Sequence, residues 1–175
     1  MKGSLILVPV LAGALVGSGA TPAVTPERGA SSAGSLRMSV EAALERGDHS
    51  TALRTTQAAH RRASREGRWE ALIEVGDAYY RIADQTGAPE AAGHKARDAY
   101  RAAFQGARRA ESLDGVLRAA EAFAQLGDAD DVALSLGVAR YLAGSDAEAV
   151  DDVRAATGRL SDLLEVARRE ELGDD

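Results

Sequence analysis

The sequence predicts an all-α fold in which antiparallel helical hairpins stack into a short solenoid. Alanine dominates the apolar residues and aromatic residues make up only 4% of the chain, a composition that suits closely packed helices better than a β-sandwich. From Leu36 onward, apolar and small residues recur every three or four positions, and no segment alternates with period two. Short breaks that combine Gly with Asp, Ser or Pro interrupt this pattern.

The breaks divide the chain into seven predicted helices. Gly can adopt the positive φ at which many helices end, and an Asp or Ser behind it can cap the next helix. Asp128 with Asp131, and Ser145 with Glu148, have capping-box spacing. Because the connections are short, consecutive helices must pack antiparallel. We expect helices at about 36–46, 49–66, 68–85, 89–111, 113–126, 129–143 and 146–171.

The N-terminal segment has the order of features found in a secretory signal peptide. Lys2 is followed by an apolar run over 5–16 and by small residues up to Ala20. This run is shorter than the roughly 20 residues of a membrane span, although an uncleaved membrane anchor is the alternative interpretation. We expect a signal peptide over 1–20 that is cleaved near Ala20, a flexible leader over 21–35, and a helical domain over 36–175. The protein is then expected to be exported to a bacterial periplasm or secreted.

Two of the breaks share a motif, and the helices between them carry a second one. The segments 43–48 (ALERGD) and 123–128 (FAQLGD) both end on Gly-Asp. The second motif consists of regularly spaced apolar, glycine, tyrosine and alanine residues: Leu72, Val75, Gly76, Tyr79, Ala96, Tyr100 and Ala103. Over roughly 40–143 this pattern resembles the tetratricopeptide repeat (TPR) family. It departs from the family in a long loop near 87–93, a missing late proline and an early Trp69.

The resemblance implies a right-handed solenoid of about three repeats, followed by a C-terminal capping helix. The physical basis of the spacing is that Gly76 lacks a Cβ, so that a partner helix can approach it closely, with Tyr79 filling the space beside it. Small residues such as Ala96 are expected where helices cross, and a larger side chain there should cost about 1–3 kcal/mol.

The last predicted helix carries one apolar stripe with charged flanks. Its members recur at three- and four-residue steps: Val150, Val153, Thr157, Leu160, Leu164 and Ala167. The stripe is expected to cover the open end of the stack, as terminal repeats do. The alternative is that it joins two copies of the chain into a homo-oligomer.

The sequence predicts neither a catalytic nor a metal site. The chain has no cysteine, which excludes disulfides, thiolate zinc sites and cysteine nucleophiles. His49, His60 and His94 lie on different predicted helices, have no partner at metal spacing, and are expected at the surface or its boundary. HExxH, GxSxG and P-loop motifs are absent. The net charge of −6 disfavours general binding to nucleic acid or anionic lipid. We expect no enzyme activity and no cofactor.

The remaining hypothesis is a surface that binds a protein or peptide partner. The resemblance implies that the first helix of each hairpin lines a concave face. The expected contact residues are Glu41, Glu45, Ile73, Asp77, Tyr80, Asp84, Leu117 and Glu121. Such a groove is acidic with one aromatic, which suits an extended basic or apolar segment. The alternatives are a solvated helix surface without a partner, and a helical-bundle ligand binder or enzyme of the cell envelope.

Overall fold

The computed structural model describes residues 27–86 and 89–172, and within this part the fold is entirely helical. This confirms the predicted all-α class. The helices are α1 (Glu27–Glu45), α2 (His49–Glu66), α3 (Trp69–Thr86), α4 (Pro89–Arg109), α5 (Leu113–Gln125), α6 (Ala129–Ala143) and α7 (Ala147–Leu172). From α2 onward their ends lie within two residues of the predicted ones.

Helix α1 begins earlier than the sequence analysis expected. It starts at Glu27 rather than near Leu36, so part of the expected flexible leader is helical. Once the turn at Leu36 is held by the core, each further residue adds one backbone hydrogen bond, and this extension carries the helix through 27–35 although Ser and Gly outnumber Ala there. The expected signal peptide and the start of the leader lie outside the described residues.

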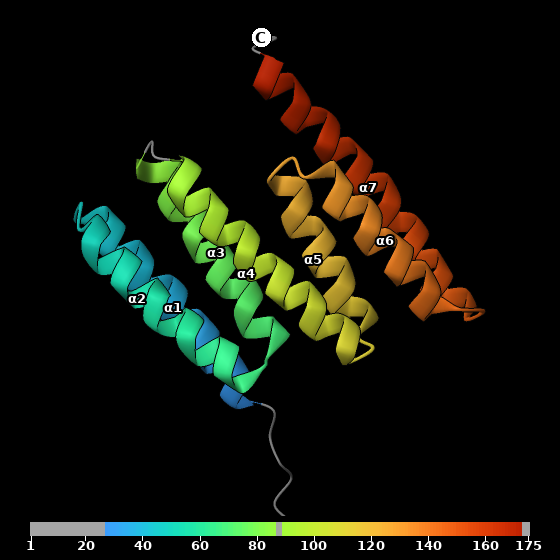
Figure 1. The fold of residues 1–175 in the computed structure, drawn as a ribbon, viewed down its shortest axis with the longest axis horizontal. Coiled ribbons are helices and arrows are strands. Elements are labelled where there is room, and N and C mark those ends of the chain that lie inside the picture. The colour runs from blue at the N-terminus through green and yellow to red at the C-terminus, as the bar shows by residue number, and fades with distance from the viewer. Residues whose placement is uncertain (1–26, 87–88, 173–175) are drawn as a thin grey trace, which may run out of the picture.

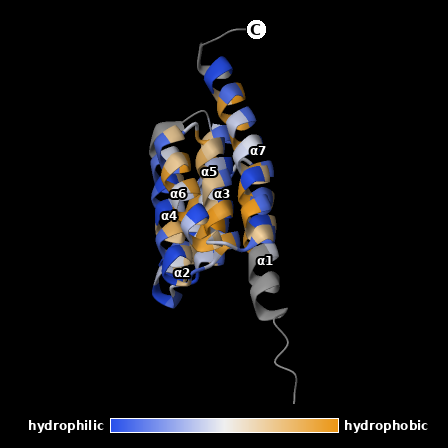
Figure 2. Ribbon diagram, turned by 90° about the vertical axis from the view of Figure 1, so that its right-hand side faces the viewer, coloured by the Kyte–Doolittle hydropathy of each residue, from blue (hydrophilic) through white to orange (hydrophobic). Residues whose placement is uncertain are grey.

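The helices form two layers. The pairs α1–α2, α3–α4 and α5–α6 are antiparallel hairpins, and each odd-numbered helix also contacts the next odd-numbered helix and the even-numbered helix before it. Figure 1 shows the hairpins side by side in chain order, and Figure 2 shows the odd-numbered helices in one layer and the even-numbered helices in the other. The structure is therefore a stack of helical hairpins.

The tightest surroundings of any described glycine are found inside the α3–α4 hairpin. A Cβ added to Gly76 would stand 2.2 Å from a ring carbon of Tyr100, so this position requires glycine. Tyr100 is fully buried, and so are Ala96 and Ala103 on the same helix. The predicted close approach at Gly76 is correct, but Tyr100 rather than Tyr79 lies over it, because Tyr79 turns instead toward α2.

A second close contact joins this hairpin to the next. Trp69, at the start of α3, lies against Gly106 of α4 and Gly115 of α5. A Cβ on Gly115 would stand 2.7 Å from the Cβ of Ala107 and 2.9 Å from ring atoms of Trp69. The two glycines thus form a slot for Trp69 at the start of α3.

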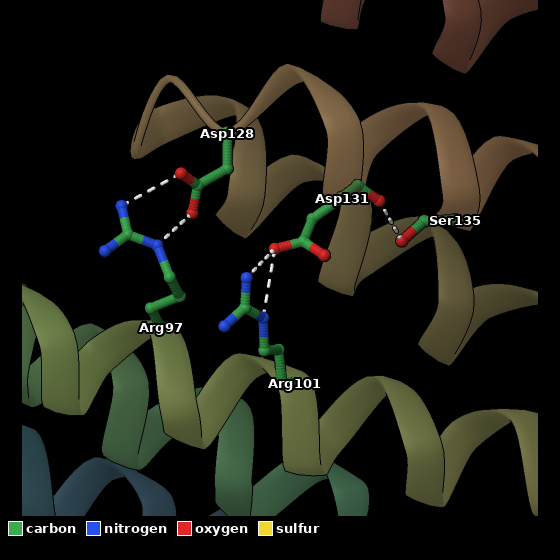
Figure 3. Close-up of polar contacts among 5 residues, drawn as sticks. All are labelled: Arg97, Arg101, Asp128, Asp131 and Ser135. Atoms are coloured by element: carbon green, nitrogen blue, oxygen red, sulfur yellow. Dashed lines mark hydrogen bonds and ion pairs between the residues drawn. The ribbon is translucent and has the colours of Figure 1, made fainter.

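The two Gly-Asp turns use their aspartates differently. Asp48 caps α2 by accepting a hydrogen bond of 3.0 Å from the Thr51 backbone N–H. Asp128 occupies the equivalent position before α6 but makes no capping bond. Its carboxylate instead accepts two hydrogen bonds from Arg97 of α4, at 2.5 and 2.9 Å (Figure 3). The expected capping box at Asp128 is therefore wrong, because a bidentate guanidinium partner outcompetes a backbone N–H.

A second arginine of α4 repeats this bridge. Arg101 donates hydrogen bonds of 2.8 and 3.1 Å to Asp131, whose backbone carbonyl accepts a bond from the hydroxyl of Ser135 (Figure 3). The capping box predicted at Ser145 is also wrong. Asp146 caps α7 by accepting from the Ala149 N–H, since α7 begins one residue later than expected.

Helix α7 covers the end of the stack, as predicted. It contacts α5 and α6, and its residues Val153, Ala156 and Leu160 are buried. Most of the residues on its opposite face are exposed and charged, which suits a terminal helix that faces solvent. Among the described helices, none has the length and apolar content needed to cross a membrane.

Candidate functional site

The layer of odd-numbered helices presents a face on which charged side chains meet across neighbouring helices. Glu41 of α1 forms an ion pair of 3.7 Å with Arg81 of α3. Between α5 and α7, the guanidinium of Arg159 donates to Glu121 at 3.2 Å. We call this surface the odd-helix face, and its charged residues are Arg37, Glu41, Glu74, Asp77, Arg81, Arg118, Glu121 and Arg159.

Opposite charges also face each other between α3 and α5, although no direct ion pair joins them among the described residues. Burial raises the pKa of Glu74 and of Asp77, and the positive charge of Arg118 on α5 opposes both shifts. The Arg118 guanidinium also lies 5.8 Å from the centre of the Trp69 ring, a cation–π arrangement that holds it in place. Acids and arginines of neighbouring odd-numbered helices therefore face one another along the whole layer.

A hollow of about 190 Å³ opens on this face between α1 and α3, and we call it the α1–α3 hollow. It is lined by Gly34, Arg37, Glu74, Asp77 and Arg81. Asp77 is half-buried here, and its carboxylate accepts a hydrogen bond of 2.9 Å from the hydroxyl of Tyr100. The floor of the hollow is thus a carboxylate that the core itself positions.

A larger hollow of about 430 Å³ lies between α5 and α7, and we call it the α5–α7 hollow. It is lined by Glu121, Gln125, Arg159, Asp162, Leu163 and Val166. Leu163 is 40% exposed and Val166 is 50% exposed, so the hollow offers two apolar side chains to solvent. It can therefore receive an apolar group, whereas the α1–α3 hollow suits charged or polar groups.

Most of the predicted contact residues lie on or near the odd-helix face. Asp77 lines the α1–α3 hollow, Glu121 lines the α5–α7 hollow, and Glu41 bridges α1 to α3. Leu117 is half-buried against the core. The remaining polar members are exposed: Glu45, Tyr80 and Asp84.

Ile73 is the exception and corrects the prediction. It is only 5% exposed and belongs to the hydrophobic core, so it is a packing residue. The apolar stripe of α3 is wider than the sequence analysis assumed, because α3 is covered by α1, α2, α4 and α5. A helix contacted from several directions buries more than one face.

The expectation of an acidic groove is also wrong, because it left out the arginines. Arg37, Arg81, Arg118 and Arg159 alternate with the acids along the odd-helix face. They recur at intervals close to one hairpin in the sequence, and this spacing is the signal that would have revealed them. The face is mixed in charge.

An apolar surface on α6 was missed altogether. Leu134 is 54% exposed and Tyr141 is 84% exposed, and both line a hollow of about 580 Å³ together with Ala133, Gly137, Val138, Leu142 and Arg108 of α4. We call this the α6 face. It belongs to the layer of even-numbered helices, and its signal in the sequence was that α6 carries apolar residues around its whole circumference.

No group of three or more His, Asp or Glu side chains in the described part of the chain could hold a metal ion. His49 and His94 are exposed and His60 is half-buried, each on its own helix. The sequence matches no protein-family model and no curated protein.

Proposed function

We propose that this chain is a non-catalytic interaction module of the TPR-like type, which holds an extended segment of a partner protein on a concave odd-helix face. One observation supports this most directly. The α1–α3 and α5–α7 hollows lie on the same set of helices, and ion pairs join α1 to α3 and α5 to α7, while Arg118 of α5 acts electrostatically on Glu74 and Asp77 of α3. A segment laid across the helices can reach both.

The two hollows define the chemistry of the partner segment. The exposed Leu163 and Val166 suit an apolar anchor. At the other end, the acids Glu74 and Asp77 lie beside Arg37 and Arg81, so a purely basic segment would meet guanidinium groups as well as carboxylates. The segment that fits best carries an apolar residue at one end and both signs of charge toward the other.

The proposed site of action is outside the bacterial cytoplasm. This part of the proposal rests on the charged, apolar and small-residue order of residues 1–20. Expression of the full chain followed by intact-mass measurement of the envelope and medium fractions tests it. A mature form that begins near Thr21 supports export with cleavage, and an uncleaved chain in the cytoplasm contradicts it.

Selection of peptides from a random library against the purified protein tests the binding surface. We expect selected peptides to bind about tenfold more weakly to Tyr80→Ala and to Val166→Asp, because each change removes or charges an exposed group of the odd-helix face. Val166 is 50% exposed and Tyr80 is 36% exposed, so circular dichroism and thermal unfolding of both variants must first match those of the parent chain. Asp77 is a poorer test, since its loss would also leave Tyr100 without its hydrogen-bond acceptor.

The control is Tyr141→Ala, which removes a tyrosine of the α6 face that is more exposed than Tyr80, at 84% against 36%. Unchanged affinity for this variant supports the odd-helix face. If the peptides instead tolerate Tyr80→Ala and Val166→Asp and lose affinity to Tyr141→Ala, the partner surface is the α6 face and the proposal is wrong.

A further inference from the structure

A third hollow, of about 410 Å³, lies between α2 and Tyr79 of α3, and we call it the Tyr79 hollow. Helix α2 contributes five polar side chains that follow one another at short helical steps, so they lie on one side of the helix. The lining residues are Gln57, His60, Arg61, Ser64 and Arg65, with Tyr79 beneath them.

Side chains from two other helices lie close to the Tyr79 ring. The His60 ring stands edge-on to it with 5.9 Å between centroids, and the ammonium nitrogen of Lys95 on α4 lies 5.8 Å from its centre. Burial raises the pKa of Tyr79, and the positive charge of Arg61 opposes this shift, as expected for a guanidinium near the phenol. Two cationic side chains and an imidazole therefore surround one aromatic ring.

The Tyr79 hydroxyl is available to a ligand. Tyr79 is only 2% exposed, and its hydroxyl makes no hydrogen bond within the described part of the chain. Among the described residues, no side-chain nitrogen or oxygen is both sealed from solvent and unpaired. The hydroxyl must therefore open onto the hollow that Tyr79 lines.

The cations of the hollow have no acidic partner of their own. Within the described residues, neither Arg61, Arg65 nor Lys95 lies within ion-pair distance of a carboxylate, whereas the neighbouring Arg62 pairs with Glu66 at 3.6 Å. Asp98 acts electrostatically on His60 from α4, but burial dominates and lowers the pKa of His60. A neutral imidazole adds one N–H donor beside the cations.

We propose that the Tyr79 hollow binds a small organic anion through a phosphate or carboxylate group. Paired guanidinium groups match the oxygens of such a group by charge-assisted hydrogen bonds. The Tyr79 hydroxyl, the Ser64 hydroxyl and the His60 ring supply further donors. The volume is that of a small-molecule site, and the Tyr79 ring with the arginine stems offers an apolar wall for the body of the ligand.

Calorimetric titration of the full chain with phenyl phosphate, benzoate and inorganic phosphate at low salt tests this proposal. We expect saturable one-site binding of phenyl phosphate or of benzoate, and the stronger of the two identifies the anionic group. Arg61→Gln and Arg65→Gln should each weaken it about tenfold, because each removes a charge-assisted donor. Tyr79→Phe should weaken it about threefold while preserving the packing of the ring.

Arg62→Gln and Arg54→Gln are the controls, since both remove a charge from the same helix without lining the hollow. Unchanged affinity in both supports a built site. Equal losses in the controls and in the hollow variants would show diffuse attraction to a basic helix and overturn the proposal. So would the absence of saturable binding by all three probes to a protein whose circular dichroism shows it folded. The result is independent of peptide binding on the odd-helix face.

Discussion

Helix α4 meets α3 and α6 in different ways. Toward α3, inside the hairpin, it presents Tyr100 to Gly76 in a contact that leaves no room for one more carbon atom. Toward α6, in the next hairpin, it presents Arg97 and Arg101 to two aspartates (Figure 3). The α3–α4 contact depends on complementary shape, and the α4–α6 contact depends on opposite charges.

The difference contrasts a packing contact inside one hairpin, which resists change, with ion pairs between two hairpins, which can adjust. Packed side chains in a core lose free energy steeply when volume is added or removed. Ion pairs near the surface contribute little each and are weakened by salt. Substitutions at the α3–α4 contact should therefore lower the free energy of unfolding more than substitutions at the α4–α6 ion pairs.

The largest effect is expected at Gly76. Gly76→Ala places a methyl group against the buried Tyr100 ring, and we expect a loss of about 1–3 kcal/mol in the free energy of unfolding. Gly137→Ala on α6 is the matched control, because nothing lies within 4 Å of its added Cβ. It should stabilise by up to about 1 kcal/mol through helix propensity. Urea unfolding followed by circular dichroism measures both, and equal behaviour of the two variants would contradict the close contact.

A smaller loss is expected at the Trp69 slot. Gly115→Ala crowds Ala107 and the indole, but Trp69 is only half-buried and can shift toward solvent. We expect about 1–2 kcal/mol of destabilisation, together with a red shift in the fluorescence of Trp69, the single tryptophan of the chain. An unshifted emission spectrum would mean that the slot adapts in some other way.

The two arginine bridges should differ from each other. The Arg97 and Asp128 side chains are 26% and 20% exposed, whereas Arg101 is 54% exposed. A double-mutant cycle of Arg97→Gln with Asp128→Asn should give a coupling of about 1 kcal/mol, and Arg101→Gln with Asp131→Asn about half as much. Both couplings should fall in NaCl at about 1 M. A coupling for Arg101 larger than that for Arg97 would reverse the order that burial predicts.

The smallest effect concerns the other Gly-Asp turn and its dependence on pH. The hydrogen bonds from Thr51 and Ser50 lower the pKa of Asp48 to about 2. Because the folded pKa lies below the unfolded one, the cap stabilises above the unfolded pKa of 3.8, and this stabilisation is lost as pH falls from there through about 2. Thermal unfolding of Asp48→Ala between about pH 5 and pH 2 should therefore show a shallower acid dependence than the parent chain. If the stability of the variant and of the parent chain fell equally with decreasing pH, the Asp48 cap would not be the source of the acid dependence.

Much of the fold followed from local patterns. The helix ends were predictable because Gly at positive φ terminates a helix wherever it stands, as at Gly47 and Gly127. The close approach at Gly76 was predictable because a glycine inside the apolar stripe of a helix usually marks a close packing contact. The residue that packs against Gly76 was not predictable, because both Tyr79 and Tyr100 were candidates. Only the rotation of α3 against α4 places Tyr100 there.

The candidate site was less predictable. Residues such as Asp77 and Glu121 could be placed on the odd-helix face from their periodicity together with the family resemblance. The arginines that balance the acids of this face come from neighbouring helices, and the pairing of Arg159 with Glu121 joins positions 38 residues apart. A sequence shows which residues are charged, but not which charges meet.

By itself, then, the sequence determined the helices, their ends apart from the start of α1, and the stacking of hairpins, because these depend on residues a few positions apart. Only the tertiary structure decided that Ile73 is buried, that Asp128 bridges rather than caps, and that Arg61, Arg65 and Lys95 gather around Tyr79 with no acid paired to them in the described part of the chain. Such features depend on how each helix is rotated against its neighbours, and this rotation is settled by the packing of the whole core.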